Sequence, residues 1–339
     1  RGDHEFLWLG TAKGPERFLV DEWGIRFRSI RSGKWRRYFS WKNIFDPFQI
    51  FFGFFQSLWR IARFHPDAVL TTGSFVAVPV ACAAKVLGVP IFVHQQDLRW
   101  GLANRIMRPL ARRISVNFEE NFTTLPAPLQ ERTQVIGNPV REAIRNLSVT
   151  PEDRDLKRVK FNLDPHRPVL LVMGGGTGAA ALNEILAQAV PALSEFCQIL
   201  HLTGKEKRVK APEGAWERSY HWQEFLTKDM PDVFAVADLV ITRAGLGTLT
   251  ELSAIGKPAI IVPMPGTHQE ENARYFTEKG AAVLLDQTTL TPSLLTRVVR
   301  EILVSEDARK LLSEKIRALS HPEAAEELAD MVISSVNIR

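Results

Sequence analysis

Residues 168–179 read PVLLVMGGGTGA, an apolar run of strand type that ends in a glycine-rich turn and leads into a helical pattern. The glycines let backbone N–H groups approach a phosphate, and the start of the following helix adds positive potential. No Gly-Lys-Ser/Thr follows, which excludes a Walker A loop, and the next strand ends in Leu202-Thr-Gly-Lys205 rather than in the acidic residue of a dinucleotide fingerprint. The stretch predicts a diphosphate site, or merely a tight turn, in a parallel α/β sheet.

The same alternation of strand and helix patterns continues in both directions from this stretch. Short apolar runs are separated by helical patterns such as residues 75–87 and 102–111. Alternation of this kind predicts parallel βαβ units and doubly wound sheets. The expected strands are residues 68–70, 91–93, 114–116 and 133–136 before the stretch, and residues 198–202, 239–241, 259–262 and 282–285 after it.

A turn and a polar segment separate the two series of strands. Residues 137–141 (GNPVR) are turn residues, and residues 148–160 are polar and charged, as in a linker or a peripheral segment. We therefore predict two Rossmann-like, doubly wound α/β domains that face each other across a cleft. The first comprises residues 1–139, the second comprises residues 140–319, and a last helix is expected within residues 320–339.

A second glycine-rich turn stands in residues 238–251 (DLVITRAGLGTLTE). The apolar run predicts a strand that ends at Thr242, and the turn leads into a helix that carries Glu251. Backbone donors and a helix start again point at an anion, and the carboxylate comes within reach of a ribose diol. The same carboxylate could serve only the helix dipole. Two such turns in one domain favour a site for a nucleoside diphosphate.

A third candidate is the Pro/Gly loop of residues 262–272 (VPMPGTHQEEN), between a strand and a polar helix start. His268, Gln269 and Asn272 can donate hydrogen bonds to sugar hydroxyls or to phosphate. Taken alone, the loop is equally consistent with an ordinary helix N-terminus.

The composition is that of a globular protein, with 45% hydrophobic and 24% charged residues. The two cysteines, Cys82 and Cys197, lie in apolar surroundings, which indicates buried thiols in a reducing compartment. No uncharged apolar run reaches the length of about 18 residues that a membrane-spanning helix needs. The sequence starts at Arg1 and residues 5–10 (EFLWLG) already indicate a buried strand, so we expect the first domain to lack its first strand and glycine loop here.

The net charge of +5 has a local origin near the start of the chain. Residues 26–42 hold seven Arg and Lys and no acidic residue, and residues 45–59 then hold six Phe and one Trp. Such a pair of segments favours contact with an anionic membrane surface, whereas the alternative is a solvated loop before a core helix. Nucleic acid is disfavoured as a partner because no nucleic-acid motif accompanies the basic run. The candidate membrane residues are Arg36, Arg37, Phe51, Phe55 and Trp59.

The order and spacing of these signals resemble the MurG family, the UDP-GlcNAc-dependent transferases of peptidoglycan synthesis. The ordered set of landmarks is specific and spans nearly the whole chain, although each piece alone is not specific. The landmarks are residues 6–11 (FLWLGT), 72–76 (TGSFV), 94–97 (HQQD), 101–104 (GLAN), 137–141 (GNPVR) and 224–226 (EFL), together with the three signals above. The resemblance implies the GT-B fold, in which the last helix, within residues 320–339, completes the first domain, and a peripheral place at the cytoplasmic face of the cell membrane.

By this resemblance the second domain binds UDP-GlcNAc, and the first domain receives a polyprenyl-diphosphate-linked muramyl-peptide. Transfer of GlcNAc then converts lipid I to lipid II, a step that serves cell-wall synthesis, cell shape and cell division. The backbone at Leu226 reads uracil, Glu251 takes the ribose hydroxyls and Gln269 contacts the sugar. The implied donor contacts are Asp97, Asn104, Arg141, Gly176, Thr177, Gly178, Leu226, Arg243, Gly245, Leu246, Gly247, Thr248, Leu249, Thr250, Glu251, His268 and Gln269.

Some positions depart from the family pattern. Gln95 stands where the family usually has Glu, Asp97 stands where it usually has Asn, and Gly176-Thr177 replaces a common Ser-Gln pair. The family's first glycine loop, whose His is a candidate general base, would precede Arg1, so the resemblance assigns no catalytic base here. His94 is a weak substitute, because a His that ends a buried strand is more often structural.

The implied reaction is a single, inverting displacement of UDP by an acceptor hydroxyl. Helix N-termini and backbone N–H groups can stabilise the leaving diphosphate, so we expect no metal and no other cofactor. Asp153-Arg-Asp155 matches the Asp-x-Asp of metal-dependent transferases, but no strand precedes it. The alternatives are another UDP-sugar transferase that acts on a lipid, a UDP-GlcNAc epimerase of the same fold, and a non-catalytic sugar-nucleotide-binding scaffold at the membrane. An epimerase would not need the basic and aromatic segments.

Overall fold

The chain divides into two compact units in the computed structural model, which describes residues 4–12, 14, 16–33, 42–175, 179–210, 213–214 and 218–336. The first unit comprises residues 1–137 and 323–339, and the second comprises residues 138–322. The chain leaves the first unit at Gly137, whose φ of +87° is one that glycine adopts without strain.

The second unit is built on a six-stranded parallel sheet with the order β12-β11-β10-β7-β8-β9. Its strands are β7 (Val169–Met173), β8 (Gln198–Leu202), β9 (Tyr220–Gln223), β10 (Leu239–Thr242), β11 (Ala259–Ile261) and β12 (Val283–Leu284). The four central strands are buried along their whole length, as expected for aliphatic runs in a parallel sheet with both faces covered.

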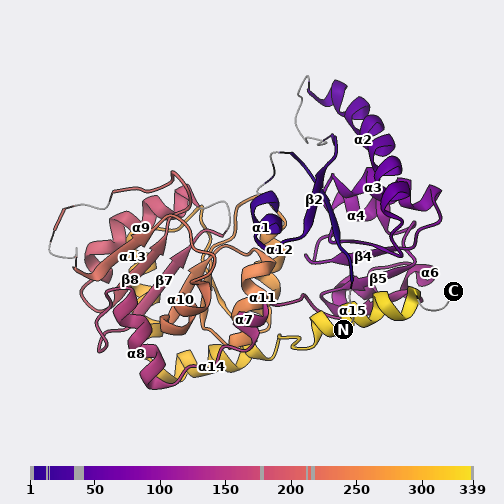
Figure 1. Ribbon diagram of the computed structural model, residues 1–339. Coiled ribbons are helices and arrows are strands. Elements are labelled where there is room, and N and C mark those ends of the chain that lie inside the picture. Colours follow the sequence, from indigo (N-terminus) through magenta and orange to yellow (C-terminus); the bar gives the residue numbers. More distant parts are fainter. Residues whose placement is uncertain are drawn as a thin grey trace. The chain divides into compact units, whose positions relative to one another are not determined.

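Helices cover both faces of this sheet, with α9 and α13 on one side and α8 and α10 on the other (Figure 1). Leu182 and Leu186 of α9 and Leu295 and Val299 of α13 are fully buried and form one core cluster with β7, β8 and β10. The helices are α7 (Glu142–Arg145), α8 (Pro151–Lys160), α9 (Ala180–Leu193), α10 (Met230–Val236), α11 (Leu246–Ile255), α12 (Gln269–Glu278), α13 (Pro292–Val304) and α14 (Glu306–Arg317).

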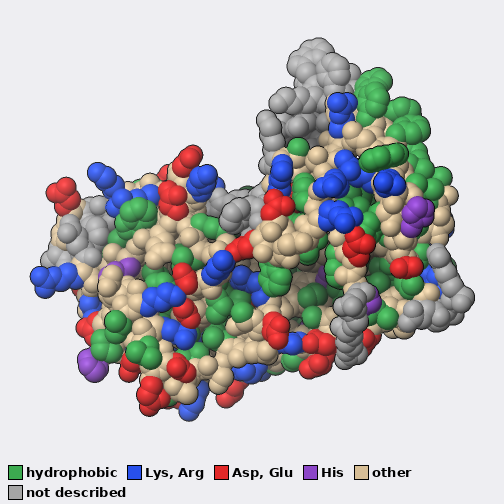
Figure 2. Space-filling view, viewed as in Figure 1, with side chains coloured by type: hydrophobic (Ala, Val, Ile, Leu, Met, Phe, Trp, Pro, Cys, Tyr) green, Lys and Arg blue, Asp and Glu red, His purple; other side chains and the backbone are tan. Residues whose placement is uncertain are grey.

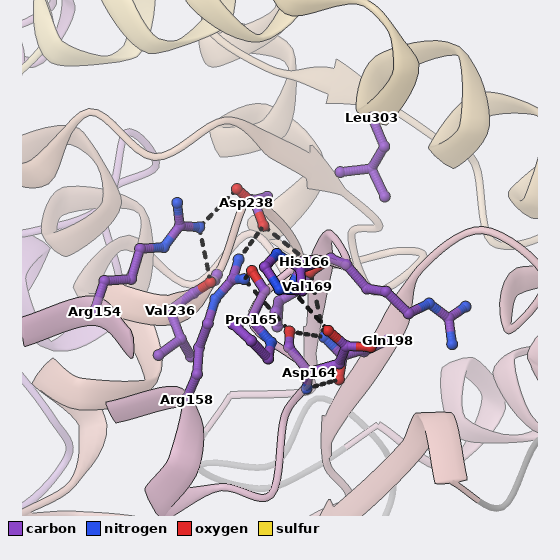
Figure 3. A network of polar contacts seen from close by, with 12 residues as sticks. Arg154, Arg158, Asp164, Pro165, His166, Val169, Gln198, Val236, Asp238 and Leu303 are labelled. Carbon is purple, nitrogen blue, oxygen red and sulfur yellow. Dashed lines mark hydrogen bonds and ion pairs between the residues drawn. The ribbon is translucent and has the colours of Figure 1, made fainter. Parts of the chain in front are cut away.

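The charged segment of residues 148–160, which the sequence predicted to be a linker or a peripheral segment, contains a helix, α8, packed on the second unit. Its N-terminus is capped by the Thr150 hydroxyl, which accepts the Asp153 N–H at 3.1 Å. Arg154 donates to Asp238 at 2.6 Å, and the buried Arg158 also contacts this carboxylate (Figure 3). The segment is therefore peripheral and not a linker, and two of its charged residues, Arg154 and Arg158, attach the helix to the unit.

The first unit contains a four-stranded parallel sheet with the order β3-β4-β5-β6 and a separate parallel pair, β1 and β2. The strands are β1 (Leu7–Gly10), β2 (Arg26–Ser29), β3 (Val69–Thr71), β4 (Ile91–Gln95), β5 (Arg113–Val116) and β6 (Thr133–Val135). The helices are α1 (Glu16–Glu22), α2 (Lys42–Phe64), α3 (Ala77–Val86), α4 (Leu102–Met107), α5 (Glu119–Thr123), α6 (Ala127–Gln130) and α15 (Ala324–Val336).

The last helix, α15, belongs to the first unit although it follows the second in sequence (Figure 1). Ala324, Leu328 and Met331 of α15 form a buried cluster with Phe92 and Ile136 of the first unit. This apolar seam explains why the chain returns after residue 322.

Two expectations about burial are corrected by the structure. Residues 7–10 do form β1, but Phe6 and Trp8 expose 62% and 45% of their surface, and the strand belongs to a two-stranded sheet that is separate from the four-stranded one. Cys197 is buried, and burial raises the pKa of its thiol to about 12, whereas Cys82 is only half-buried. Among the helices that the structure describes, none has the length and apolar character needed to cross a bilayer.

Candidate functional site

The glycine-rich turns after β7 and β10 begin side by side in the sheet. The strands β7 and β10 are neighbours, with Met173 in register with Thr242. From β7 the chain proceeds to β8 and β9 on one side, and from β10 it proceeds to β11 and β12 on the other. The order in which strands are added therefore reverses between β7 and β10. Open α/β sheets bind ligands at such a point, at the carboxyl ends of their strands.

Helix α11 presents an open N-terminus at this point. Its N-cap, Gly245, is extended (φ −77°, ψ 124°) and supplies no capping side chain. The N–H groups of Leu246, Gly247 and Thr248 have no acceptor within the helix, because the first turn lacks preceding carbonyls. A Cβ built on Gly245 or Gly247 would meet no atom within 4 Å. This combination can receive an anion such as a diphosphate.

The turn after β7 is described only in part. Gly175 has a φ of +74°, so it adopts a conformation that favours glycine, and a Cβ there would meet nothing within 4 Å. Gly176, Thr177 and Gly178, three of the predicted contacts, lie outside the described residues.

Glu251 is held by an arginine from the segment that opens the second unit. Arg141 donates through Nε and Nη2 to the two carboxylate oxygens, at 2.7 and 3.1 Å. The Asn138 amide of the same segment donates to the Thr250 hydroxyl at 3.3 Å. A bidentate pair of this kind fixes the orientation of the carboxylate, which can then accept hydrogen bonds from a diol. Two residues predicted at the donor site, Arg141 and Glu251, are therefore in direct contact.

The loop after β11 is shaped by the first residues of α12. Gln269 Oε1 accepts the Met264 N–H and Glu270 Oε1 accepts the Gly266 N–H, both at 3.0 Å. Within the described part of the chain, the Gln269 side-chain nitrogen makes no hydrogen bond, so it is available to a ligand. His268, which precedes the helix, is exposed.

Some predicted contacts face the protein interior instead of a ligand. Asn272 is fully buried, and its amide donates to Ala244 O at 3.1 Å, which ties α12 to the turn after β10. Arg243 is also buried and donates to Val262 O and Pro263 O at 2.9 and 3.1 Å, and burial lowers the pKa of its guanidinium. Leu249 and Thr250 are buried on α11 as well. Their place in the motif is thus explained by packing.

Leu226 lies beyond the carboxyl end of β9, the edge strand of the sheet, and is half-buried. The pairing of β8 and β9 continues into this region, because the Thr203 and Gly204 N–H groups donate to Gln223 O and Glu224 O, each at 2.9 Å. The segment around Leu226 therefore starts from the same carboxyl edge as the two glycine-rich turns.

In the first unit, Gln95 organises the loop that contains Asp97. Its amide nitrogen donates to Asp97 O at 2.6 Å and to Arg99 O at 3.0 Å, and its oxygen accepts from the Asn104 amide at 2.7 Å. Asn104 is only 5% exposed, so it supports the loop and presents little surface to a ligand. The sequence showed Gln95 only as a departure from the family pattern, and the role of its amide was missed.

His94 is fully buried at the end of β4, and its Nδ1 lies 2.9 Å from the Ser115 hydroxyl. A general base must reach the acceptor hydroxyl directly or through one water. The burial of His94 and its partner in the sheet favour the structural role over the catalytic one.

The aromatic residues of α2 form an exposed stripe on the first unit. Gly53, Ser57 and Ile61 are buried on the inner side of the helix, while the outer side carries the stripe (Figure 2). We call this outer surface the aromatic face; it consists of Phe48, Phe51, Phe52, Phe55 and Trp59, which expose 49–62% of their surface. Large exposed apolar patches mark sites of contact with proteins or membranes. Arg36 and Arg37 lie outside the described residues.

Asp153 and Asp155 lie near the amino ends of the strands, whereas the glycine-rich turns follow the carboxyl ends. They lie on α8, whose Arg154 binds Asp238 just before β10, and Asp238 accepts the N–H of Val169 at the start of β7. These contacts place α8 at the amino ends of β7 and β10, so its two aspartates lie at the edge of the sheet opposite to the turns. No group of three or more potential metal-ligating side chains occurs among the residues that the structure describes.

Comparisons with known proteins agree with this geometry. Residues 169–328 match the glycosyltransferase family 28 C-terminal domain, and residues 1–116 match the N-terminal domain of the same family. The chain is 31% identical to a Legionella pneumophila (strain Paris) protein over 98% of this chain and 89% of that one, and 34% identical to a Treponema denticola protein over 94% and 85%. Both relatives are named UDP-N-acetylglucosamine–N-acetylmuramyl-(pentapeptide) pyrophosphoryl-undecaprenol N-acetylglucosamine transferase.

Solved structures give the same result. The crystal structure of Acinetobacter baumannii MurG superposes with a TM-score of 0.71 at 26% identity, covering 97% of this chain and 91% of that one. A UDP-GlcNAc 2-epimerase from Neisseria meningitidis superposes with a TM-score of 0.68 at 13% identity, covering 96% and 90%, and this likeness concerns the fold alone.

Proposed function

The chain belongs to the MurG family of glycosyltransferases, and we propose on this basis that it moves N-acetylglucosamine from UDP-GlcNAc to a lipid-linked muramyl-pentapeptide in peptidoglycan synthesis. One structural observation carries the proposal for the donor: the glycine-rich turns after β7 and β10 start side by side at the reversal point of the sheet, with Glu251 on the helix that follows one of them. The fold is the GT-B fold of the family.

The proposed donor site uses the carboxyl edge of the second unit. The N–H groups at the start of α11 receive the diphosphate, Glu251 accepts from the ribose hydroxyls and the Gln269 amide donates to the sugar. The backbone near Leu226 reads uracil. Arg141 supports Glu251 from the side, and its positive charge lies close enough to the same edge to favour an anionic donor.

The reaction is a single displacement at the anomeric carbon. The acceptor oxygen forms a bond to that carbon while the bond from the carbon to the β-phosphate oxygen breaks, and UDP leaves with the electron pair. The acceptor proton passes to a base that the described residues do not identify. Charge develops on the departing diphosphate, where preoriented N–H groups stabilise it more in the transition state than in the ground state. We propose that no metal ion is needed for this stabilisation.

The polyprenyl acceptor would require the enzyme to work at a bilayer, and we propose peripheral binding through the aromatic face of α2. Arg31 and Arg60 lie over the Phe52 and Trp59 rings at 5.7 and 5.5 Å, so cations flank the exposed aromatics. An apolar surface flanked by basic groups suits the interface of an anionic membrane.

Release of UDP from UDP-GlcNAc, measured with and without a lipid-linked muramyl-pentapeptide, tests the proposal. We expect release that depends on the acceptor and that persists in EDTA. Equal release in both arms would indicate a different UDP-sugar reaction, such as hydrolysis. Loss of activity in EDTA with recovery in Mg²⁺ or Mn²⁺ would overturn the metal-independent mechanism while leaving the donor and acceptor assignments intact.

A further inference from the structure

Three polar side chains form a hydrogen-bonded chain inside the core of the second unit. Asn183 lies in the first turns of α9, His201 on β8 and Tyr220 on β9, and they are 1%, 2% and 9% exposed. The Tyr220 hydroxyl lies 2.8 Å from His201 Nδ1, and His201 Nε2 lies 3.1 Å from Asn183 Oδ1. Apolar side chains could fill this volume without the cost of burying polar groups. We therefore expect these three hydrogen-bonded residues to do more than fill the core.

Asn183 determines the direction of each hydrogen bond among these three side chains. The Asn183 amide nitrogen donates to Thr203 O at 2.8 Å and to Lys207 O at 2.9 Å. Its oxygen must therefore accept, so His201 donates through Nε2 and accepts the Tyr220 O–H at Nδ1. All bonds point the same way, and such a series is mutually reinforcing. The series ends on the backbone of one loop.

That loop, residues 203–207, has a shape that needs support. Gly204 and Glu206 both have positive φ values, +83° and +57°. For Glu206 this conformation is unfavourable, so surrounding contacts must hold it. The two bonds from Asn183 brace the loop at its first and last residues, on the side of the core.

The loop lies next to the parts of the proposed donor site. It follows β8, the sheet neighbour of β7, at the same edge as the turn that begins at Gly174 after β7. On its other side it contacts Glu224, whose carbonyl accepts the Gly204 N–H at 2.9 Å and whose side chain accepts the Glu206 N–H at 3.3 Å. Leu226 comes two residues later. The loop thus stands between the start of the glycine-rich turn after β7 and the segment proposed to read uracil.

We propose that Asn183, His201 and Tyr220 are positioning residues for the donor: through residues 203–207 they fix the backbone of Glu224 to Leu226 relative to the start of the glycine-rich turn at Gly174. None of the three touches the donor. This inference rests on the proposed function, since it assigns the carboxyl edge of the second unit to a UDP-sugar.

Two variants of different severity test the proposal. Tyr220→Phe keeps the ring and removes only the first hydrogen bond, whereas Asn183→Leu removes both bonds to the loop. We expect the KM for UDP-GlcNAc to rise about threefold in the first and about tenfold or more in the second, with kcat at saturating donor changed less than about twofold. The dissociation constant for UDP, measured by calorimetry, should rise in parallel. Faster hydrogen exchange at the Thr203 and Gly204 amides should accompany these changes.

Cys197→Ala is the matched control, because Cys197 is buried in the same core at the opposite end of β8. It should lower the thermal midpoint without changing the affinity for UDP. If Tyr220→Phe and Asn183→Leu behave like this control, with lower midpoints and unchanged affinity, the three residues are merely structural and the inference is overturned. Failure of the unsubstituted protein to bind UDP would instead overturn the proposed function. Should Asn183→Leu fail to fold, Tyr220→Phe alone decides.

Discussion

Gln269 and Glu270 are adjacent residues that bind the same loop, and this makes them a matched pair. Both side-chain oxygens accept a loop N–H at 3.0 Å, but only Gln269 also carries an amide nitrogen that can donate to a sugar hydroxyl. We expect Gln269→Ala to weaken UDP-GlcNAc binding about five- to fiftyfold more than UDP binding, because one hydrogen bond in a closed site is lost. Glu270→Ala should affect both nucleotides equally. Titration of each variant with both ligands decides whether Gln269 reads the sugar.

Arg141 and Arg243 belong to two of the sequence motifs, yet their surroundings predict opposite effects of substitution. Arg243 is buried with its guanidinium on backbone carbonyls, so Arg243→Lys should lower the free energy of unfolding by about 2–4 kcal/mol. Arg141 is largely solvated, and Arg141→Lys should leave stability within about 0.5 kcal/mol while weakening UDP binding through a less well oriented Glu251. Denaturant titration and calorimetry on both variants check this. A stable Arg243→Lys protein that has lost UDP binding would return Arg243 to the ligand site.

For single residues, the sequence predicted where the motifs lie but not which of their side chains face the site and which face the core. Glycine spacing revealed the two turns because glycine is needed where backbone approaches a phosphate. Nothing in the sequence separates Glu251, which is held at the site, from Asn272, which is buried one loop away and bound to Ala244 O. That distinction depends on how α11 and α12 rotate about their axes when they pack.

Helix α2 is apolar on two sides, and among the described residues of the first unit only its inner side is packed against other elements. On the inner side the backbone of α2 at Gly53 lies against the backbone at Arg31, because a Cβ at Gly53 would lie 1.9 Å from Arg31 O. The outer side is the aromatic face. The six Phe residues within residues 45–59 indicated the second apolar side from the sequence, because one buried side needs fewer apolar residues.

The aromatic face gives a prediction about membrane binding. Phe51→Ser combined with Phe55→Ser should weaken binding to vesicles that contain anionic lipid by about tenfold or more, because two aromatic rings no longer enter the interface. High salt should weaken the binding of the unsubstituted protein only in part, since the aromatic contribution is not screened. Leu156→Ser with Val159→Ser is the control, because these side chains are 71% and 70% exposed on α8 of the second unit. Sedimentation with vesicles, alongside UDP affinity and thermal midpoint, distinguishes lost membrane contact from unfolding.

Regular elements were predicted well where hydrophobic periodicity is strong and poorly where charges take part in packing. The strand expected at residues 198–202 is observed as β8 with the same ends. Helix α8 was missed because Arg154 and Arg158 serve as its attachment to Asp238, and a charged sequence alone indicates solvent. The exposure of Trp8 on β1 was missed for the converse reason, since apolar residues alone indicate burial.

At the scale of the whole molecule, each unit has its own core, and the chain crosses between them twice. The first crossing was indicated by the turn residues at 137–141. The return of α15 to the first unit depends on an apolar seam with Phe92 and Ile136, which are more than 180 residues away in sequence. Contacts at that separation leave no periodic signal in a single sequence, so the family resemblance, and not a pattern in the chain, predicted that the last helix joins the first domain. The core of the six-stranded sheet contains a buried histidine, His201, and we expect its titration to make the stability of the second unit depend on pH.

Burial lowers the pKa of His201 to about 4 in the folded protein, compared with 6.5 for an ordinary histidine. Between these values the unfolded chain binds a proton that the folded unit excludes, so the free energy of unfolding falls as pH drops from about 6.5 to about 4, by at most about 3 kcal/mol from this group. Replacing the ring by an uncharged amide, His201→Gln, should flatten this part of the curve, although its stability near neutral pH will be lower. His166→Gln, at an exposed position, serves as the control and should keep the slope of the unsubstituted protein. Urea titrations at half-unit steps of pH measure the slope. Parallel curves for the His201 variant and the unsubstituted protein would show that the ring binds a proton as readily in the folded protein as in the unfolded chain, and the lowered pKa of His201 would then be wrong.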